Sequence, residues 1–154
     1  QYCVDENLNP KFDESNKENV YTRNKVRNLL IPYIEKEFNP NIIESISRLS
    51  DLATQESNFV DNVVDKEFKN TLISYNESDI KLDLKKFNNL DSFIKAKIIL
   101  KSVAKLFYTT KGIEKFHIED VIKLCERNIG NKYLTPNKNL KFFIKKGVIT
   151  ISKV

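Results

Sequence analysis

The chain is poor in the residues from which cofactor and metal sites are commonly built. Its 154 residues include no methionine or tryptophan, three glycines, two cysteines and one histidine. The glycines stand alone at positions 112, 130 and 147, so no glycine-rich loop is present whose amides would cradle the phosphates of a nucleotide. One histidine and two distant cysteines make no metal site. We therefore expect neither an ATP site nor a metal centre within this sequence.

Other absences concern processing and location. The chain has no secretion signal and no apolar run of membrane length, so we expect a cytoplasmic protein with reduced thiols and no membrane contact. Because it begins with Gln1 rather than methionine, we interpret it as part of a longer protein. It also shows no nucleophile and base, or pair of carboxylates, at a convincing spacing. Cys125 follows Val121 and Ile122 at helical spacing, which favours a core position.

Positive charge gathers in the second half of the chain. Residues 1–80 hold 9 Lys and Arg against 15 Asp and Glu, whereas residues 81–154 hold 17 against 6. The basic half is where an RNA backbone would be met, since phosphate contacts give affinity that does not depend on sequence. A Lys-rich chain carries such charge without a partner as well, so the sequence leaves both interpretations open.

The longest predicted element is a helix from about residue 40 to 72. Asn39 suits the N-cap and Pro40 the first helical position, and apolar residues then recur at steps of three and four. We expect this helix to be the spine of a domain and to be buried along a wide apolar stripe, with a break near residues 55–58 as an alternative. A homodimeric coiled coil is a further alternative, although the flanking positions lack consistent charge.

The remainder suggests a mainly α fold with a short C-terminal β-hairpin. Ile80, Leu82 and Leu84 alternate with polar residues and predict a short extended segment. Asp91-Ser92 is expected to cap a helix through Phe107, and a second helix is predicted over residues 118–128, with His117 in a structural role at its entrance. Apolar residues alternate over 140–151 around the basic turn Lys145-Lys146-Gly147, which indicates the hairpin.

A compact motif precedes the long helix. Ser15 and Glu18 have the spacing of a capping box, so a helix is expected to start there. Arg23 and Arg27 are four residues apart and would project from one helical face, where two guanidinium groups can hold a pair of phosphates. The alternative is that they solvate the outside of the helix or pair with Asp13 and Glu18. A kink or a new start of the helix is expected at Pro32.

These residues resemble a known family. The segments that carry the resemblance are Asp13-x-Ser15-Asn16, Tyr21-Thr22-Arg23-Asn24-x-Val26-Arg27, Leu30-Ile31-Pro32 and Asn39-Pro40-Asn41-Ile42. Together they are similar to the end of the catalytic domain of bacterial tRNA(Ile)-lysidine synthases. Residues 117–124 and Leu134-Thr135-Pro136 follow in the order expected of that family's first C-terminal domain. Glu14 and Asn137 depart from the proline and glycine that are common in the family.

The resemblance implies an organisation and a function. Residues 1–34 would be the tail of an N-terminal ATP-pyrophosphatase domain with its connecting helix, and residues 35–154 a helical tRNA-binding domain. The family uses ATP with Mg²⁺ and free lysine to convert the wobble cytidine of tRNA(Ile) with a CAU anticodon to lysidine. The ATP and metal sites would lie in the missing catalytic domain, so this chain alone is expected to be inactive.

The resemblance also implies site residues. Arg23, Asn24 and Arg27 would contact tRNA, and no catalytic residue or metal ligand falls in this chain. The lysine at position 25, which lies off the arginine face, and lysines of two other regions are candidates for the tRNA backbone: Lys25, Lys97, Lys101, Lys105, Lys145 and Lys146. Lysines 95, 97, 101 and 105 would form one stripe, for which a solvated helix face is the alternative. The remaining motif residues would be structural: Asp13, Ser15, Asn16, Pro32, Asn39 and Pro40.

Two other classes of function remain open. A helix over 118–128 followed by a basic hairpin is typical of a DNA-binding regulator with a helix-and-wing element, and duplex DNA binding in preference to tRNA would favour it. The apolar stripe of residues 40–72 would also suit a helical protein-interaction or dimerisation module. A tight dimer in sedimentation would favour that class.

Overall fold

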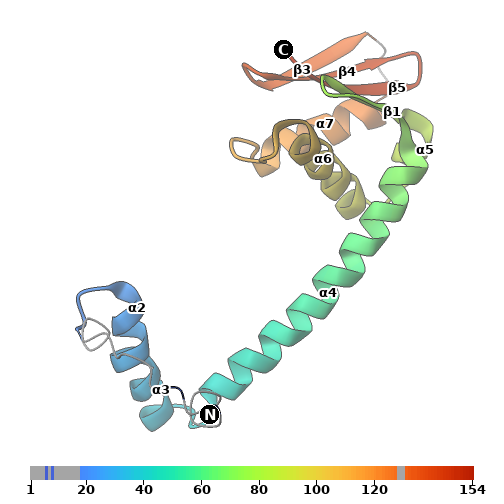
Figure 1. Cartoon of the computed structure of the whole chain (residues 1–154). Coiled ribbons are helices and arrows are strands. Elements are labelled where there is room, and N and C mark those ends of the chain that lie inside the picture. The colour runs from blue at the N-terminus through green and yellow to red at the C-terminus, as the bar shows by residue number, and fades with distance from the viewer. Residues whose placement is uncertain (1–5, 7, 9–17, 128–130) are drawn as a thin grey trace. The chain divides into compact units, whose positions relative to one another are not determined.

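The structure is a computed structural model that describes residues 6, 8, 18–127 and 131–154 (Figure 1). The chain divides into two compact units, residues 1–56 and residues 57–154. Asp13, Ser15 and Asn16 lie outside the described residues, so the Ser15 half of the expected capping box is not tested. Residues 18–21 are described and are not helical, so the helix expected to start at Ser15 does not run through Glu18; the first described helix starts at Thr22. Each unit is described separately below.

The first unit contains one helical stretch made of three parts. These are α2 (Thr22–Lys25), the π-helical turn η2 (Val26–Leu30) and α3 (Ile31–Glu37). The Ile31 amide donates to the Val26 carbonyl, five residues back, immediately before Pro32. Proline has no amide and crowds the carbonyl four residues earlier, so a wider turn relieves the clash. The irregularity predicted at Pro32 therefore takes the form of a π turn.

Helix α4 (Ile42–Thr71) is the longest element. The Asn39 Oδ1 atom accepts the Asn41 amide at 2.9 Å, and the Asn39 carbonyl accepts the Ile42 amide at 3.1 Å, so the helix starts two residues after the predicted position. No break occurs near residues 55–58.

The expectation that α4 is buried along its length is wrong. The buried residues of α4 all lie near its C-terminal end: Val64, Phe68 and Thr71. Large apolar side chains of the preceding turns are exposed: Ile43, Ile46, Leu49, Leu52 and Phe59.

The second unit is built on a five-stranded antiparallel sheet in the order β1-β2-β5-β4-β3. Its strands are β1 (Leu72–Tyr75), β2 (Asp79–Asp83), β3 (Lys132–Asn137), β4 (Leu140–Lys145) and β5 (Val148–Lys153). The predicted hairpin is formed by β4 and β5. The sheet is larger than this hairpin, because β5 also pairs with β2 and β4 also pairs with β3. Helices still dominate the fold.

Three helices complete this unit: α5 (Leu84–Asn88), α6 (Ser92–Phe107) and α7 (Lys115–Glu126). Asp83 and Asp91 cap α5 and α6, their Oδ1 atoms accepting the amides of Lys86 and Phe93 at 2.8 Å. Leu84 therefore starts a helix instead of extending the strand. The His117 Nδ1 atom accepts the Glu114 amide at 3.1 Å, so the histidine has the structural role expected of it.

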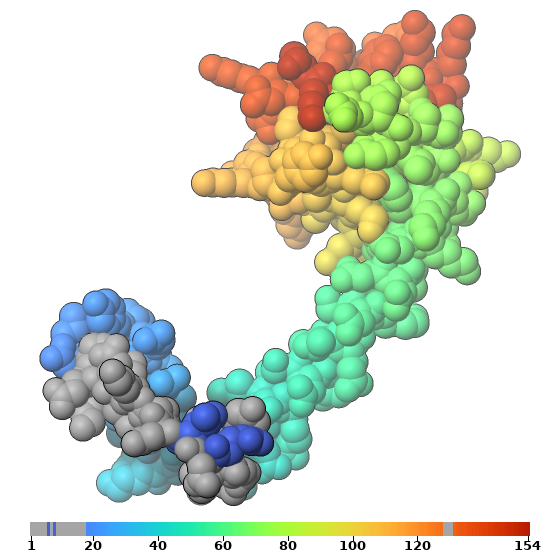
Figure 2. Space-filling view, viewed as in Figure 1, coloured from blue at the N-terminus to red at the C-terminus, as the bar shows by residue number. Residues whose placement is uncertain are grey.

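Helices α6 and α7 cover one face of the sheet, and the core lies between these helices and the sheet (Figures 1 and 2). Alternation along the strands turns one set of side chains inward: Ile80, Leu82, Leu140, Phe142, Ile144, Ile149 and Ile151. They meet the apolar faces of α6 and α7, which include Ile98, Val103, Val121 and Cys125. Cys125 is fully buried, as its spacing predicted.

Candidate nucleic-acid interface

The two arginines singled out from the sequence lie on the helix of the first unit. Arg23 belongs to α2 and Arg27 to η2, and both are exposed. Between them Asn24 is 2 % exposed, and its Nδ2 atom donates to the Glu18 carbonyl at 2.8 Å. A second amide contact joins Asn28 Nδ2 to Asn19 Oδ1 at 3.1 Å. The two asparagines thus tie the preceding segment to the helix that carries the arginines.

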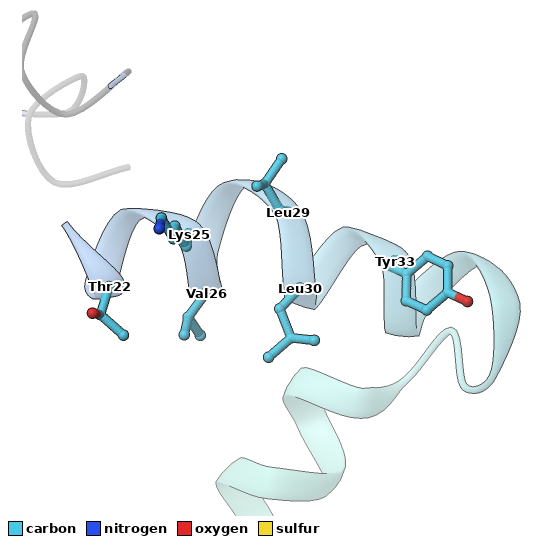
Figure 3. A pocket seen from close by; sticks show the side chains of 6 residues that line it. All are labelled: Thr22, Lys25, Val26, Leu29, Leu30 and Tyr33. Atoms are coloured by element: carbon cyan, nitrogen blue, oxygen red, sulfur yellow. The ribbon is translucent and has the colours of Figure 1, made fainter. Parts of the chain in front are cut away.

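The same helix bears an exposed apolar surface. A shallow hollow of about 450 Å³ is lined by Thr22, Lys25, Val26, Leu29, Leu30 and Tyr33. Figure 3 shows Thr22, Val26 and Leu30 pointing to one side and Leu29 to the other. Leu29, Leu30 and Tyr33 are each about half exposed. Because large apolar side chains seldom gather on a free surface, this helix has the character of an element that packs against another body.

The lysine stripe of α6 is only partly free. Lys95 is 5 % exposed and its Nζ atom lies 2.9 Å from Glu126 Oε1, so its predicted place on the solvated stripe is wrong. Lys101 forms an ion pair with Asp65 of α4, and this hydrogen bond lowers the pKa of the Asp65 carboxyl. Lys97 and Lys105 lie over the rings of Phe93 and Tyr75, at 5.5 and 4.5 Å from the ring centres.

The other two lysines lie at the turn between β4 and β5. Lys146 has φ 49° and Gly147 φ 75°, so two successive residues are left-handed, as tight hairpin turns require. Lys145 and Lys146 are exposed there. The structure therefore brings Lys145 and Lys146 together at one turn, brings Arg23, Asn24, Lys25 and Arg27 together on one helix, and holds Lys97, Lys101 and Lys105 on a third element.

The described residues offer little for catalysis. No group of three or more His, Cys, Asp or Glu is found among them that would hold a metal ion. Burial raises the pKa of the Cys125 thiol to about 12, so this cysteine stays protonated and unreactive. No helix in the described ranges is both long and apolar enough to cross a membrane.

Comparison with known proteins identifies the family. The chain is 32 % identical over 152 residues to the tRNA(Ile)-lysidine synthase of Clostridioides difficile strain 630, which covers 99 % of the chain and 33 % of that protein. It is 33 % identical over 153 residues to the Clostridium acetobutylicum protein of the same name, 98 % of the chain and 32 % of that protein. This chain belongs to the tRNA(Ile)-lysidine synthase family. No protein-family model matches it.

The relationship extends over both units. The match to the Clostridium perfringens strain 13 tRNA(Ile)-lysidine synthase is 34 % identical over 132 residues, 86 % of the chain and 28 % of that protein. The chain spans about a third of the length of the tRNA(Ile)-lysidine synthases it matches. The family resemblance read from residues 13–42 therefore continues through the sheet of the second unit.

One surface escaped the sequence interpretation. The face of the sheet opposite α6 and α7 carries Tyr133, Lys141 and Phe143, which the hairpin prediction left unassigned. The alternation over 140–145 already places Lys141, Phe143 and Lys145 on a common face. Tyr133 joins them only through the pairing of β3 with β4, and that pairing was not readable from the sequence.

Proposed function

We propose that this chain is the non-catalytic tRNA-recognition part of a tRNA(Ile)-lysidine synthase. Residues 1–34 then end the N-terminal ATP-pyrophosphatase domain and its connecting helix, and residues 35–154 form the first C-terminal domain. The observation that carries the proposal is the match over 99 % of the chain to a third of a tRNA(Ile)-lysidine synthase. Such an enzyme works in the cytoplasm, where its tRNA is found.

The whole enzyme would use ATP and lysine to convert the wobble cytidine of a CAU-anticodon tRNA(Ile) to lysidine. The described residues of this chain do not fit ATP with Mg²⁺. Gly112 and Gly147 lie in separate turns, and no carboxylate cluster for a metal is found among the described residues. We therefore place the ligase chemistry in the part of the enzyme outside this chain.

We propose the helix of the first unit as the main tRNA contact of this chain. Arg23 and Arg27 are exposed and carry planar guanidinium groups that suit bidentate contact with phosphate oxygens. Asn24 is buried, so it supports this contact by holding the Glu18 carbonyl in place and thereby fixing the start of the helix. These contacts position the tRNA and do not read its sequence.

Lysines supply the second set of backbone contacts. Lys25, Lys145 and Lys146 are exposed and available to phosphates. In the described part of the chain, Lys97 and Lys105 contact neighbouring rings, whereas Lys101 would have to leave Asp65 to reach the tRNA. We rank these lysines as phosphate contacts by the interaction that each ammonium group must break before it binds tRNA.

Charge reversal at the two arginines tests the proposal. In the full-length enzyme, Arg23→Glu with Arg27→Glu is expected to weaken tRNA(Ile) binding and slow lysidine formation. The slope of log K against log salt should fall by about 1.4–1.8 for two lost phosphate contacts. Arg48→Glu with Lys66→Glu, at two exposed positions of α4, is the matched control with the same change of charge. Unchanged binding and lysidine formation in the double variant would show that these arginines do not hold tRNA.

A helical interaction module is the second candidate function. The exposed apolar residues of α4, including Ile46, Leu49 and Phe59, favour it. Sedimentation of the chain decides, because a tight dimer abolished by Leu49→Lys would support association through α4.

The DNA-binding alternative is weaker. Both strands of its expected wing, β4 and β5, are internal to the sheet, so the turn alone projects.

A further inference from the structure

The second unit has a sheet face that carries aromatic and basic side chains. Helices α6 and α7 pack against the opposite face (Figure 1), so the side chains that alternate away from the core share this one. The strand register sets them in a row across four strands. In that row Lys81 lies beside Thr150, Thr150 beside Phe143 and Phe143 beside Tyr133.

Two aromatic residues are paired across neighbouring strands at one end of this row. Tyr133 is 60 % exposed on β3, and Phe143, directly opposite on β4, is half-buried but is not part of the core cluster. The Lys141 Nζ atom lies 4.8 Å from the centre of the Tyr133 ring and 5.7 Å from that of Phe143. Tyr133 and the half-buried Phe143 lie outside the core cluster beneath one ammonium group, so part of their ring surface is left for a ligand.

Charge around the rings is positive. Lys141 and Lys145 lie on either side of Phe143 along β4, about 13 Å apart at the usual strand rise. The acidic side chains of this face, Asp79 and Asp83, are on β2, separated from β4 by β5, and Asp79 is 3.9 Å from the Nζ atom of Lys81.

Aromatic side chains flanked by lysines are a common arrangement for binding unpaired nucleotides. Every base has a π face, so stacking on aromatic side chains tolerates any sequence, while ammonium groups hold the phosphates between the bases. We propose that this sheet face binds a single-stranded segment of RNA, with bases stacked on Tyr133 and Phe143 and phosphates held by Lys141 and Lys145. The inference rests on the proposed function, which makes a tRNA the ligand, and assigns its unpaired nucleotides to the sheet.

The lysine over the rings fits both states of this surface. Without RNA, the Lys141 ammonium occupies the ring faces through cation–π contact. When a base takes that place, the four-carbon side chain lets the ammonium turn to an adjacent phosphate. Binding therefore replaces the two ring contacts of Lys141 with base stacking on the rings and a phosphate contact of the ammonium group.

The test uses the 154-residue chain, an end-labelled single-stranded RNA decamer, a 10-base-pair RNA duplex and tRNA(Ile), each across a salt series. Because the chain has no tryptophan, Tyr133→Trp introduces a single tryptophan on the sheet, whose emission is excited selectively, and Phe116→Trp is its control on α7. Phe116 is a suitable match because it is 52 % exposed. A second comparison removes rings. The double variant Tyr133→Leu/Phe143→Leu removes both rings of the sheet face, and its control Phe116→Leu removes an exposed ring of α7.

We expect the decamer to bind more tightly than the duplex and to quench the emission of Trp at position 133 but not at 116. The double leucine variant should lose about tenfold or more in affinity for the decamer with an unchanged salt slope, because stacking is lost and phosphate contacts stay. Lys141→Gln should lower the slope instead. If the double variant is not folded, Tyr133→Leu alone, at an edge strand, replaces it.

Three results of the RNA measurements overturn the inference: equal or tighter duplex binding, no quenching at position 133, or full affinity in the leucine variants. A peptide or protein ligand that binds this face in place of RNA would also overturn it. The proposed function fails separately, if the wild-type chain does not bind tRNA(Ile) even at low salt. Full tRNA binding by the leucine variants refutes the stacking surface and leaves the proposed function standing.

Discussion

The two partners of the ion pair between Lys95 and Glu126 should differ strongly in how much stability is lost when each is removed. The Lys95 side chain is 6 % exposed, whereas that of Glu126 is 50 % exposed, and Nζ lies 2.9 Å from Oε1. Removing the carboxylate leaves an ammonium group buried between helices without its partner. Removing the ammonium leaves a carboxylate that water already reaches.

The magnitudes follow from this difference in exposure. Breaking a fully buried pair costs about 3–5 kcal/mol, and the partial exposure of Glu126 reduces this, so we expect Glu126→Ala to cost about 2–3 kcal/mol. Lys95→Met fills the same space with apolar atoms and should stay within about 1 kcal/mol of wild type. Glu126 is the last residue of α7, where the helix dipole disfavours a negative charge. In the Lys95→Met background, Glu126→Ala should therefore be neutral or slightly stabilising.

Urea unfolding of the four proteins measures the cycle. With a slope m of about 2 kcal/mol per M, Glu126→Ala should lower the midpoint by about 1–1.5 M, with m unchanged. The coupling free energy of the double-mutant cycle should be about 2–3 kcal/mol. Equal costs for Lys95→Met and Glu126→Ala, or additivity of the two, would refute the reasoning.

Further predictions concern the core, the buried thiol and the turn. Phe142 is 1 % exposed, so Phe142→Ala should cost about 3–5 kcal/mol in urea unfolding, and a cost below about 1 kcal/mol would contradict its central place. In a Cys3→Ser variant, the Cys125 thiol should react with a disulfide reagent at pH 8 only as the protein unfolds; fast labelling of folded protein would contradict its burial. The folded pKa of Cys125, about 12, exceeds the ordinary 9.0, so the folded state binds the proton more tightly and stability should fall as the pH rises above about 9. Gly147 has φ 75° with no atom within 4 Å of an added Cβ, so Gly147→Ala should cost about 1 kcal/mol through the backbone alone, and no loss would argue against the left-handed turn.

Local signals in the sequence predicted the starts of the two longest helices, α4 and α6, well. Asn39 and Pro40 placed the start of α4 within two residues, and Asp91 placed that of α6. Both depend on short-range hydrogen bonds to the first turn, which adjacent residues decide. The turn at Gly147 was equally local.

Non-local pairing was not predictable. Strand β3 contains Pro136, which argues against a strand, yet β3 is an edge strand where a missing amide is tolerated. Strand β1 directly follows the long helix and has no alternation to mark it. Without these two strands the hairpin looked isolated, so the aromatic surface around Tyr133 was missed.

The candidate site divides in the same way. Helical spacing placed Arg23 and Arg27 on one helix, and both are exposed. The spacing of the α6 lysines predicted one solvated stripe, but Lys95 is buried against Glu126 and Lys101 pairs with Asp65. Which lysine faces a neighbouring helix depends on packing between α6, α7 and α4, and a single helix does not encode that packing.

Binding of this chain to unmodified tRNA(Ile) with a CAU anticodon tests the central claim most directly. Elongator methionine tRNA and a DNA duplex of equal charge serve as controls, and all three are measured across a salt series. The account predicts that tRNA binds more tightly than the duplex and that its affinity falls steeply with salt, as phosphate contacts require. No binding of tRNA, or tighter binding of the duplex, would contradict the claim that this chain recognises tRNA.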